Sequence, residues 1–274
     1  MRCVKCGLVY RNPRPPEDEL LSHFASDEVS GQHKKAVWYD AKIKLFEKNL
    51  RKIEKLSSKG RLLDVGCGYG TFLKMAADMG WRVSGVELSS SACKYASETL
   101  GLNIFKGTLK NARFQDNYFD VVTLWGVLEL LNNPSDELLE INRILKSGGL
   151  LVFRTRNVTF HLNVHLMFDN LARRLKIKPT VFQLYGFSAK TATRMLEKTG
   201  FNSIKVVNSE LTTGDPYKSG EIFTELGMKL IKTITYSVCQ SMFYLTGGSL
   251  ILAPSILVFA KKPLNDSEKG YVKN

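Results

Sequence analysis

The 274 residues of this chain are enough to bury one large core, and the 44% hydrophobic share is that of an ordinary globular protein. The net charge of +13 favours an anionic substrate or a membrane surface as partner. Because the basic residues are spread along the chain and no RNA-binding module is visible, we expect no nucleic-acid partner. The five unevenly spaced cysteines and the polar, basic start indicate a cytoplasmic protein without a signal peptide.

Residues 1–35 form a predicted N-terminal arm that begins with a Cys-x-x-Cys pair, Cys3 and Cys6, followed by Gly7. This spacing is half of a zinc knuckle, but structural zinc needs four ligands and the arm offers two. Two free thiols explain the pair at least as well, so we expect no metal and name Cys3 and Cys6 as the only candidate ligands. The segment PEDELLSHF, with a proline and acids in its first turn, predicts a short helix.

Apolar residues at helical spacing predict a longer helix over 36–56, with Phe46 and Leu50 on one face. Trp38 and Tyr39 lie at the start of this helix. These two aromatic side chains either cover a bound ligand or pack against the rest of the protein.

The stretch RLLDVGCGYG, residues 61–70, predicts a short apolar strand that runs into a glycine-rich turn, and TFLKMAADMG behind it predicts a helix. Gly66, Gly68 and Gly70 stand at alternate positions, where side chains would keep a ligand away from the backbone. The free N–H groups of the following helix point at that ligand. Dinucleotide and mononucleotide sites use the same kind of turn, so the turn alone does not identify the ligand.

Two carboxylates near the turn limit the kinds of ligand that it can bind. Asp64 lies at its mouth, where a carboxylate repels a pyrophosphate but suits a cation. Glu87 ends the next predicted strand, about 20 residues on, where a carboxylate can accept hydrogen bonds from two ribose hydroxyls. A ribose with a positive charge and no phosphate describes S-adenosylmethionine (SAM), which we expect as the cofactor. The expected cofactor-binding residues of this region are Asp64, Gly66, Cys67, Gly68, Gly70, Glu87 and Leu88.

Four motifs in this order and spacing resemble those of class I SAM-dependent methyltransferases: LLDVGCGYG, GVELS, FDVVTLWGVLELLNNP and RILKSGGLLVF. The resemblance is greatest to the bacterial group that includes the ubiquinone-biosynthesis O-methyltransferases, and it is strong over residues 59–153. It implies an α/β fold with a Rossmann-like seven-stranded mixed sheet, six strands parallel and one antiparallel, and helices on both faces. The antiparallel strand is expected at SILVFAKK, residues 255–262.

The resemblance also places adenine contacts after the third predicted strand. Thr108 and Leu109 stand where the family contacts the adenine, and their backbone groups would have to make the contact because no acidic side chain is evident there. The buried parallel strand FDVVTLW ends at Trp125, beside the ligand crevice. Trp125 either stacks on the adenine, walls the methyl group or packs in the core.

The sequence departs from the family where a histidine is often present. The family's Leu-Glu-His run stands here as Leu-Glu-Leu at 128–130, which leaves Glu129 as a polar candidate near the site or as a structural carboxylate. The insertion 158–187 is expected to shape the acceptor pocket, and it carries His161 and His165 on one helix face. Without a third ligand we expect no metal at these histidines, and each is either a general base or structural. The catalytic residue is therefore unknown, with Glu129, His161 and His165 as candidates.

Arg156 replaces the proline of the family's Thr-Pro-Asn ending after the fifth strand. A cation at the mouth of the crevice favours an anionic acceptor. A solvated arginine is the alternative.

The chain contains no charged residue from Thr233 to Ala260. This run exceeds the ~20 apolar residues that a membrane-spanning helix needs, but a Gly-Gly pair and a proline interrupt it. We expect instead a helix over 221–246. It either packs within the protein or in a dimer, or it lies on a bilayer surface, with residues 221–248 in peripheral contact.

The expected units are an arm (1–35), a SAM-binding core (36–157), a substrate-pocket insertion (158–187), the last part of the sheet with an apolar helix (188–262) and a flexible tail (263–274). Related methyltransferases carry two Cys-x-x-Cys pairs, so this arm either starts at the second pair or has lost the zinc site. The resemblance implies transfer of the sulfonium methyl group to a small-molecule or lipid-linked acceptor. A SAM-binding pseudoenzyme or scaffold is the main alternative, supported by the missing histidine. A different enzyme on the same fold and an NAD-dependent oxidoreductase are further alternatives, and Asp64 opposes the latter.

Overall fold

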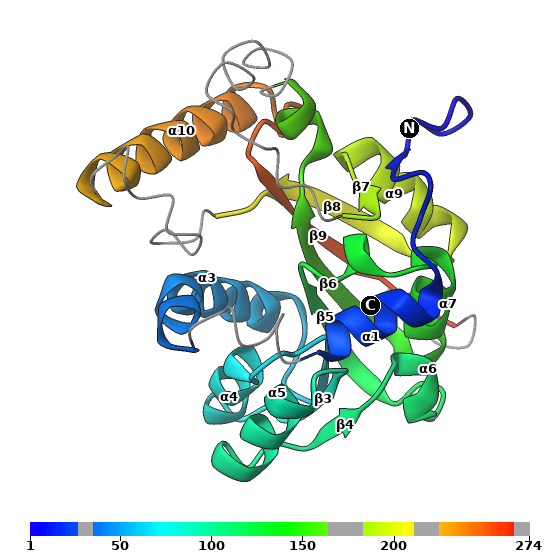
Figure 1. Ribbon diagram of the computed structural model, residues 1–274. Helices are drawn as coiled ribbons and strands as arrows, with labels where there is room; N and C mark the ends of the chain where they lie inside the picture. The colour runs from blue at the N-terminus through cyan, green and yellow to red at the C-terminus, as the bar shows by residue number, and fades with distance from the viewer. Residues whose placement is uncertain (27–34, 164–182, 211–224, 266–274) are drawn as a thin grey trace, which may run out of the picture.

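The computed structural model describes residues 1–26, 35–163, 183–210 and 225–265. At its centre lies a seven-stranded sheet in the order β4-β3-β2-β5-β6-β9-β8 (Figure 1). Its strands are β2 (Arg61–Val65), β3 (Arg82–Glu87), β4 (Ile104–Lys106), β5 (Phe119–Trp125), β6 (Leu145–Arg156), β8 (Asn202–Asn208) and β9 (Ser255–Lys261). β9 pairs antiparallel with both β6 and β8, whereas the ladders from β4 to β6 are parallel. The predicted sheet of six parallel strands and one antiparallel strand is therefore confirmed.

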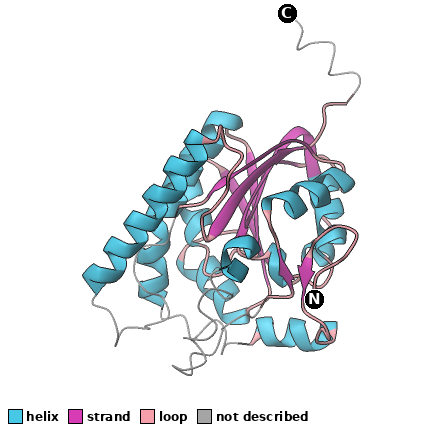
Figure 2. Cartoon of the chain, turned by 90° about the horizontal axis from the view of Figure 1, so that it is seen from above, coloured by secondary structure: helices cyan, strands magenta, loops and turns pink. Residues whose placement is uncertain are grey.

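Helices cover both faces of this sheet (Figure 2). The helices of the core are α3 (Lys35–Leu56), α4 (Thr71–Asp78), α5 (Ser90–Lys94), α6 (Leu109–Ala112), α7 (Pro134–Ile144) and α9 (Ala189–Lys198). Alternate residues of β5 feed two hydrophobic clusters: Val121 packs with residues of α3 and α4, and Val122 packs with residues of α7 and α9. A strand that is buried on both faces must be apolar at nearly every position, which explains the run FDVVTLW.

Side-chain caps start the helices that follow the strand ends. The Ser89 side chain accepts a hydrogen bond from the Ala92 N–H and begins α5, which continues into a π-helical turn over Tyr95–Thr99. The Thr108 side chain caps α6 in the same way. These caps fix where the chain turns back at the carboxyl end of the parallel strands, which is the end where ligands bind in open α/β sheets.

The N-terminal arm docks on the second half of the chain. β1 (Val9–Tyr10) pairs antiparallel with β7 (Tyr185–Gly186), and α1 (Glu17–Ala25) follows. Arg14 donates a hydrogen bond to the Asn132 carbonyl at 3.0 Å and another to the Tyr185 hydroxyl. Sequence analysis missed the β1–β7 pairing because strands of two residues carry no periodicity.

A long helix, α10 (Glu225–Leu245), lies in the connection between β8 and β9 and extends outward from the sheet (Figure 1). Asn208, the last residue of β8, donates to the Cys239 carbonyl at 3.0 Å and accepts from the Ala253 N–H at 3.0 Å, which fastens the helix and the following loop to the strand. Within the described residues, no helix combines the length and the apolarity that crossing a bilayer requires.

Candidate functional site

The glycine-rich bend between β2 and α4 has the open geometry that the motif predicts. Gly66, Gly68 and Gly70 all have positive φ, of 68°, 55° and 79°. A Cβ on Gly66 would lie 2.5 Å from the Val127 Cγ2, so this glycine is needed for packing within the chain. A Cβ on Gly68 would meet no atom of the described residues within 4 Å. Space therefore lies open against the Gly68 backbone, where a ligand can approach.

Glu87 joins this bend to the end of β3. Its Oε2 accepts a hydrogen bond from the Gly68 N–H at 2.7 Å, and its Oε1 accepts from the Leu88 and Ser89 N–H groups at 2.8 and 2.9 Å. Three backbone donors hold the carboxylate in place. Oε1 already accepts two hydrogen bonds, so the site for a further bond is on Oε2. The acid predicted to bind a ribose thus lies against the bend predicted to receive the ligand.

Asp64 is buried near the end of β2, with 2% of its surface exposed. Its Oδ1 accepts a hydrogen bond from the Thr123 hydroxyl at 2.6 Å. Burial raises the pKa of Asp64 to about 8, and the neighbouring charge of Glu87 acts in the same direction, whereas the Thr123 hydrogen bond and Lys42 oppose the rise. The two acids stand near the carboxyl ends of the adjacent parallel strands β2 and β3, and a bound cation would favour the ionised form of Asp64.

Lys42 on α3 is a charged group that sequence analysis missed. Burial lowers its pKa to about 8 and Arg154 acts in the same direction, whereas Asp64 and Glu129 oppose the fall. A lysine four residues before Phe46, on the apolar face of an amphipathic helix, was the available signal. The site therefore combines two acids with a cation from a helix far away in sequence.

Trp125 at the end of β5 packs against two aromatic rings. Its ring centroid lies 4.8 Å from that of Phe72 and 5.4 Å from that of Phe46. Its indole Nε1 is buried and has no hydrogen-bond partner among the described residues. These contacts correspond to the packing alternative, and an adenine contact stays a prediction. The Leu109 side chain is buried in the core, with 1% of its surface exposed. The predicted adenine contact of Thr108 and Leu109 would therefore come from their backbone groups.

Glu129 is buried in the short 3-10 turn after β5, with 3% of its surface exposed. Its Oε1 accepts a hydrogen bond from Gln183 at 3.2 Å, and its Oε2 is buried without a partner among the described residues. Burial raises the pKa of Glu129, while its own backbone and the charges of Arg154 and Arg156 oppose the rise. A carboxylate with a spare oxygen and a raised pKa suits proton transfer.

The two candidate histidines have different outcomes. The His161 Nε2 lies 3.0 Å from the Pro254 carbonyl oxygen, and desolvation with the charge of Arg156 lowers the pKa of its ring. This contact is a structural one, so a catalytic role for His161 stays a prediction. His165 lies outside the described residues.

The cysteines of the bend and of the arm lie in no metal cluster of the described residues. The Cys67 thiol in the glycine bend is buried, and desolvation raises its pKa well above the usual value, so it contributes packing rather than a thiolate. In the arm, hydrogen bonds from the Cys6 backbone and thiol lower the pKa of Cys3. No group of three or more metal-binding side chains occurs in the described parts of the chain, and a role for Cys3 and Cys6 stays a prediction.

Comparison with known proteins decides the family. A family model described as a methyltransferase domain matches residues 37–206, which contain the bend, both acids and Lys42. The chain belongs to the class I SAM-dependent methyltransferases. The predicted resemblance is thereby confirmed, and SAM is the cofactor that this family uses.

Relatives of known sequence agree with this assignment. The ubiquinone biosynthesis O-methyltransferase of Maricaulis maris is 34% identical over 105 residues, which cover 36% of this chain and 41% of that protein. An uncharacterised protein of Methanocaldococcus jannaschii is 27% identical over 172 residues, 63% of this chain and 79% of that protein. The match thus spans less than half the length of the O-methyltransferase.

Solved structures show the same fold. A SAM-dependent methyltransferase of Thermotoga maritima superposes with a TM-score of 0.56 at 20% identity, over 88% of this chain and 99% of that one. Phosphoethanolamine N-methyltransferase 2 of Haemonchus contortus, in complex with SAM, superposes with a TM-score of 0.60 at 17% identity, over 93% of this chain and 61% of that one.

The side chains at the bend fit SAM. Open space at Gly68 leaves room for a ligand against the backbone, and the Glu87 Oε2 has an acceptor site for a hydroxyl group. Asp64 offers a carboxylate to a positive charge, and Lys42 offers an ammonium to a carboxylate. A SAM molecule carries a positive sulfonium, two ribose hydroxyls and a carboxylate, so each charged group of the site has a counterpart.

Proposed function

We propose that this chain transfers the methyl group of SAM to a small-molecule or lipid-linked acceptor that carries an anionic group. The observation that carries the proposal is the hydrogen bond of Glu87 to the open Gly68 bend, with the buried Asp64 near the end of the adjacent strand β2. SAM supplies a methyl group that is already activated by the sulfonium charge. The protein then needs mainly to bind, align and desolvate the reactants, so a missing histidine does not prevent the reaction.

In this proposal the residues of the bend hold the cofactor. Glu87 accepts hydrogen bonds from the ribose hydroxyls, and Asp64 complements the positive charge. Lys42 pairs with the carboxylate of the methionine part. Gly66, Cys67, Gly70 and Leu88 shape the bend around Gly68, while backbone groups of Thr108 and Leu109, with Trp125, border the adenine.

On the acceptor side, the arginines at the end of β6 support an anionic acceptor. The Arg154 Nε donates a hydrogen bond to the Ser209 hydroxyl at 2.9 Å, and both Arg154 and Arg156 lie close enough to Glu129 to oppose the rise in its pKa. The Glu129 Oε2, for which the described residues offer no hydrogen-bond partner, accepts the proton of the substrate hydroxyl or amine. The two arginines favour a methyl acceptor with an anionic group. The carboxylate of Glu129 favours one whose nucleophilic oxygen or nitrogen loses a proton.

We also propose that the chain is divided into the five units from the arm at 1–35 to the tail at 263–274. The proposed location is the cytoplasm, at a membrane surface when the acceptor is lipid-linked. No nucleic acid enters the proposed reaction. A SAM-binding scaffold without methyl transfer is the second candidate, and the Leu-Glu-Leu run at 128–130 favours it.

Two measurements test the proposal. Calorimetry with SAM and with NAD should show binding of SAM alone, and NAD binding without SAM binding would refute the cofactor assignment. Methyl-labelled SAM incubated with the protein and a cell extract should label a small molecule or lipid. SAM binding without any labelled product would favour the scaffold.

A further inference from the structure

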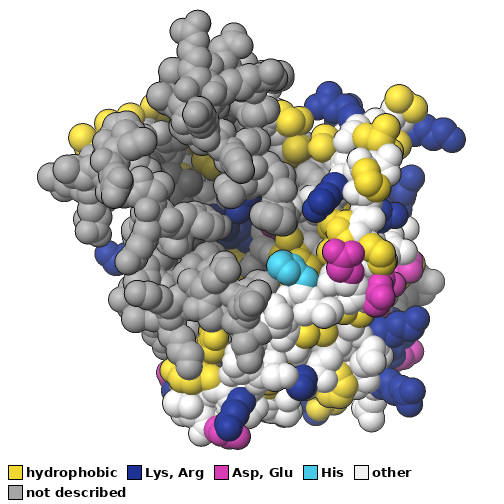
Figure 3. All heavy atoms as spheres, in the orientation of Figure 1, with side chains coloured by type: hydrophobic (Ala, Val, Ile, Leu, Met, Phe, Trp, Pro, Cys, Tyr) yellow, Lys and Arg dark blue, Asp and Glu magenta, His cyan; other side chains and the backbone are white. Residues whose placement is uncertain are grey.

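An apolar ridge runs along the outer side of α10. Leu230, Ile234, Val238 and Met242 follow one another at intervals of four residues and are 60%, 54%, 52% and 42% exposed. Residues four apart share one helix face, so these side chains form one line, and Leu245 at 79% exposure extends it. Figure 3 shows apolar side chains along the edge of the molecule where Figure 1 places α10.

This ridge is long and apolar. α10 has 21 residues, which gives it a length of about 30 Å. No charged residue occurs from Thr233 to Ala260, so the sequence of the ridge from Ile234 onward contains no charge. A contiguous apolar surface of this kind marks a protein or membrane interaction site.

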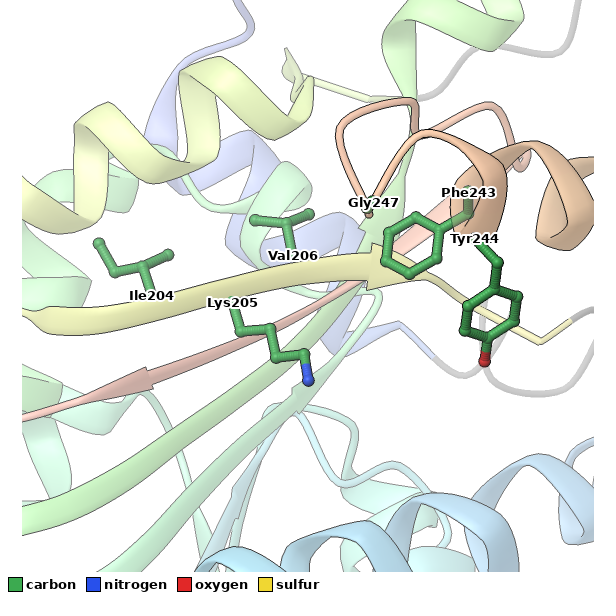
Figure 4. A pocket seen from close by; sticks show the side chains of 7 residues that line it. Ile204, Lys205, Val206, Phe243, Tyr244 and Gly247 are labelled. Atoms are coloured by element: carbon green, nitrogen blue, oxygen red, sulfur yellow. The ribbon is translucent and has the colours of Figure 1, made fainter.

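A hollow with a cationic group lies at the end of the ridge. It has a volume of about 460 Å³ and lies between β8 and the last turn of α10. Figure 4 shows the Lys205 side chain on one side of β8 and Val206 on the other, with Phe243 and Tyr244 of α10 at the end of the strand. Tyr244 is 76% exposed. An ammonium and a phenol hydroxyl next to apolar walls match a phosphate headgroup above acyl chains.

The loop after α10 ties this surface to the crevice end of the sheet. The Asn157 side chain donates to the Ile251 and Ala253 carbonyls at 3.2 and 3.0 Å, and its N–H donates to the Pro254 carbonyl at 2.9 Å. Asn157 follows the end of β6, the end at which the arginines of the proposed acceptor side stand. Leu250 and Leu252 in the same loop are 39% and 36% exposed.

The overall charge selects the occupant. A second copy of the chain would bring together two bodies of charge +13 each, which repel one another. An anionic bilayer attracts the same charge and receives the apolar ridge at its headgroup boundary. We propose that the ridge of α10, with the Lys205–Tyr244 hollow, docks on the surface of an anionic phospholipid bilayer. This docking would bring a lipid-linked acceptor to the crevice, a consequence that rests on the proposed methyl transfer, whereas the docking itself does not.

Vesicle sedimentation of the full chain tests the docking. The wild type should sediment with vesicles in which about one third of the phosphatidylcholine is replaced by phosphatidylglycerol, and more weakly with phosphatidylcholine alone. Binding should fall as salt rises from about 0.05 to about 0.5 M. Val238→Asp should reduce binding roughly tenfold or more because it places a carboxylate in the ridge. Leu139→Asp is the matched control, since both side chains are 52% exposed and Leu139 lies on α7.

Three results would overturn the proposal. The first is that the wild type stays in the supernatant with both kinds of vesicle. The second is that the two aspartate variants lose vesicle binding equally. The third is that ultracentrifugation without vesicles finds a dimer that Val238→Asp dissociates. SAM calorimetry on the same samples keeps the two proposals apart. Wild type that binds vesicles but not SAM would refute the cofactor site alone, and the reverse result would refute the docking alone.

Discussion

Replacement of Gly68 by alanine separates ligand access from folding. In the described part of the chain, no atom lies within 4 Å of the Gly68 Cβ position, and the φ of Gly68 is 55°. Gly101 has a φ of 66° and an equally open Cβ position, in the turn before β4. The two glycines therefore impose the same backbone strain, but only Gly68 faces the proposed cofactor.

The expected costs follow from this geometry. An alanine in the left-handed region costs about 1–2 kcal/mol, so both variants should lower the melting temperature by several degrees and remain folded. At Gly68 the new methyl group extends about 1.5 Å into the space of the cofactor. A cofactor displaced by this distance has donor–acceptor distances longer than those of normal hydrogen bonds. Losing two such bonds costs about 2 kcal/mol, or roughly thirtyfold in Kd.

Titration calorimetry with SAM, with circular dichroism as the check on folding, measures both effects. We expect Gly101→Ala to bind SAM as the wild type does and Gly68→Ala to bind it far more weakly. Equal SAM affinity in the two variants would show that the cofactor does not lie against this bend, and the assignment of the site would be wrong.

Four further predictions concern the charged groups of the site. Glu87→Ala should weaken SAM binding by an order of magnitude or so, while Glu98→Ala, on the exposed side of the turn after α5, should not; equal effects would remove the ribose assignment. Lys42→Met should weaken SAM binding roughly tenfold and the exposed Lys44→Met should leave it unchanged, as measured by calorimetry, and no difference would refute the carboxylate pairing. Because the pKa of Asp64 is raised to about 8, most of this carboxyl is protonated near neutral pH, and a bound cation lowers the pKa; SAM binding should therefore release a proton, seen as a buffer-dependent enthalpy that Asp64→Asn abolishes. Burial raises the pKa of Glu129, so a rate that needs its ionised form should rise with pH through that pKa; Glu129→Gln should lower the rate by about 10²–10⁴ and remove the rise, and an unchanged pH profile would exclude Glu129 as the base.

Sequence by itself determined the sheet and the centre of the site. The apolar run of β5 and the alternating glycines of residues 66–70 predict their own local structure. A strand buried on both faces requires apolar residues at consecutive positions, and a turn with positive φ favours glycine. The acids at Asp64 and Glu87 follow from the same reasoning, since adjacent parallel strands bring their carboxyl ends to one edge.

Tertiary structure alone decided which distant side chains join that centre. Lys42 enters from α3, and only its packing over the sheet places it beside Asp64 and lowers its pKa. The ring of Trp125 turns to Phe46 and Phe72 because those helices offer an aromatic pocket, which no local pattern around residue 125 reveals. Burial of Glu129 likewise arises from residues far along the chain, including Gln183. Local patterns fix backbone conformation, whereas side-chain environment depends on contacts between segments that are far apart in sequence.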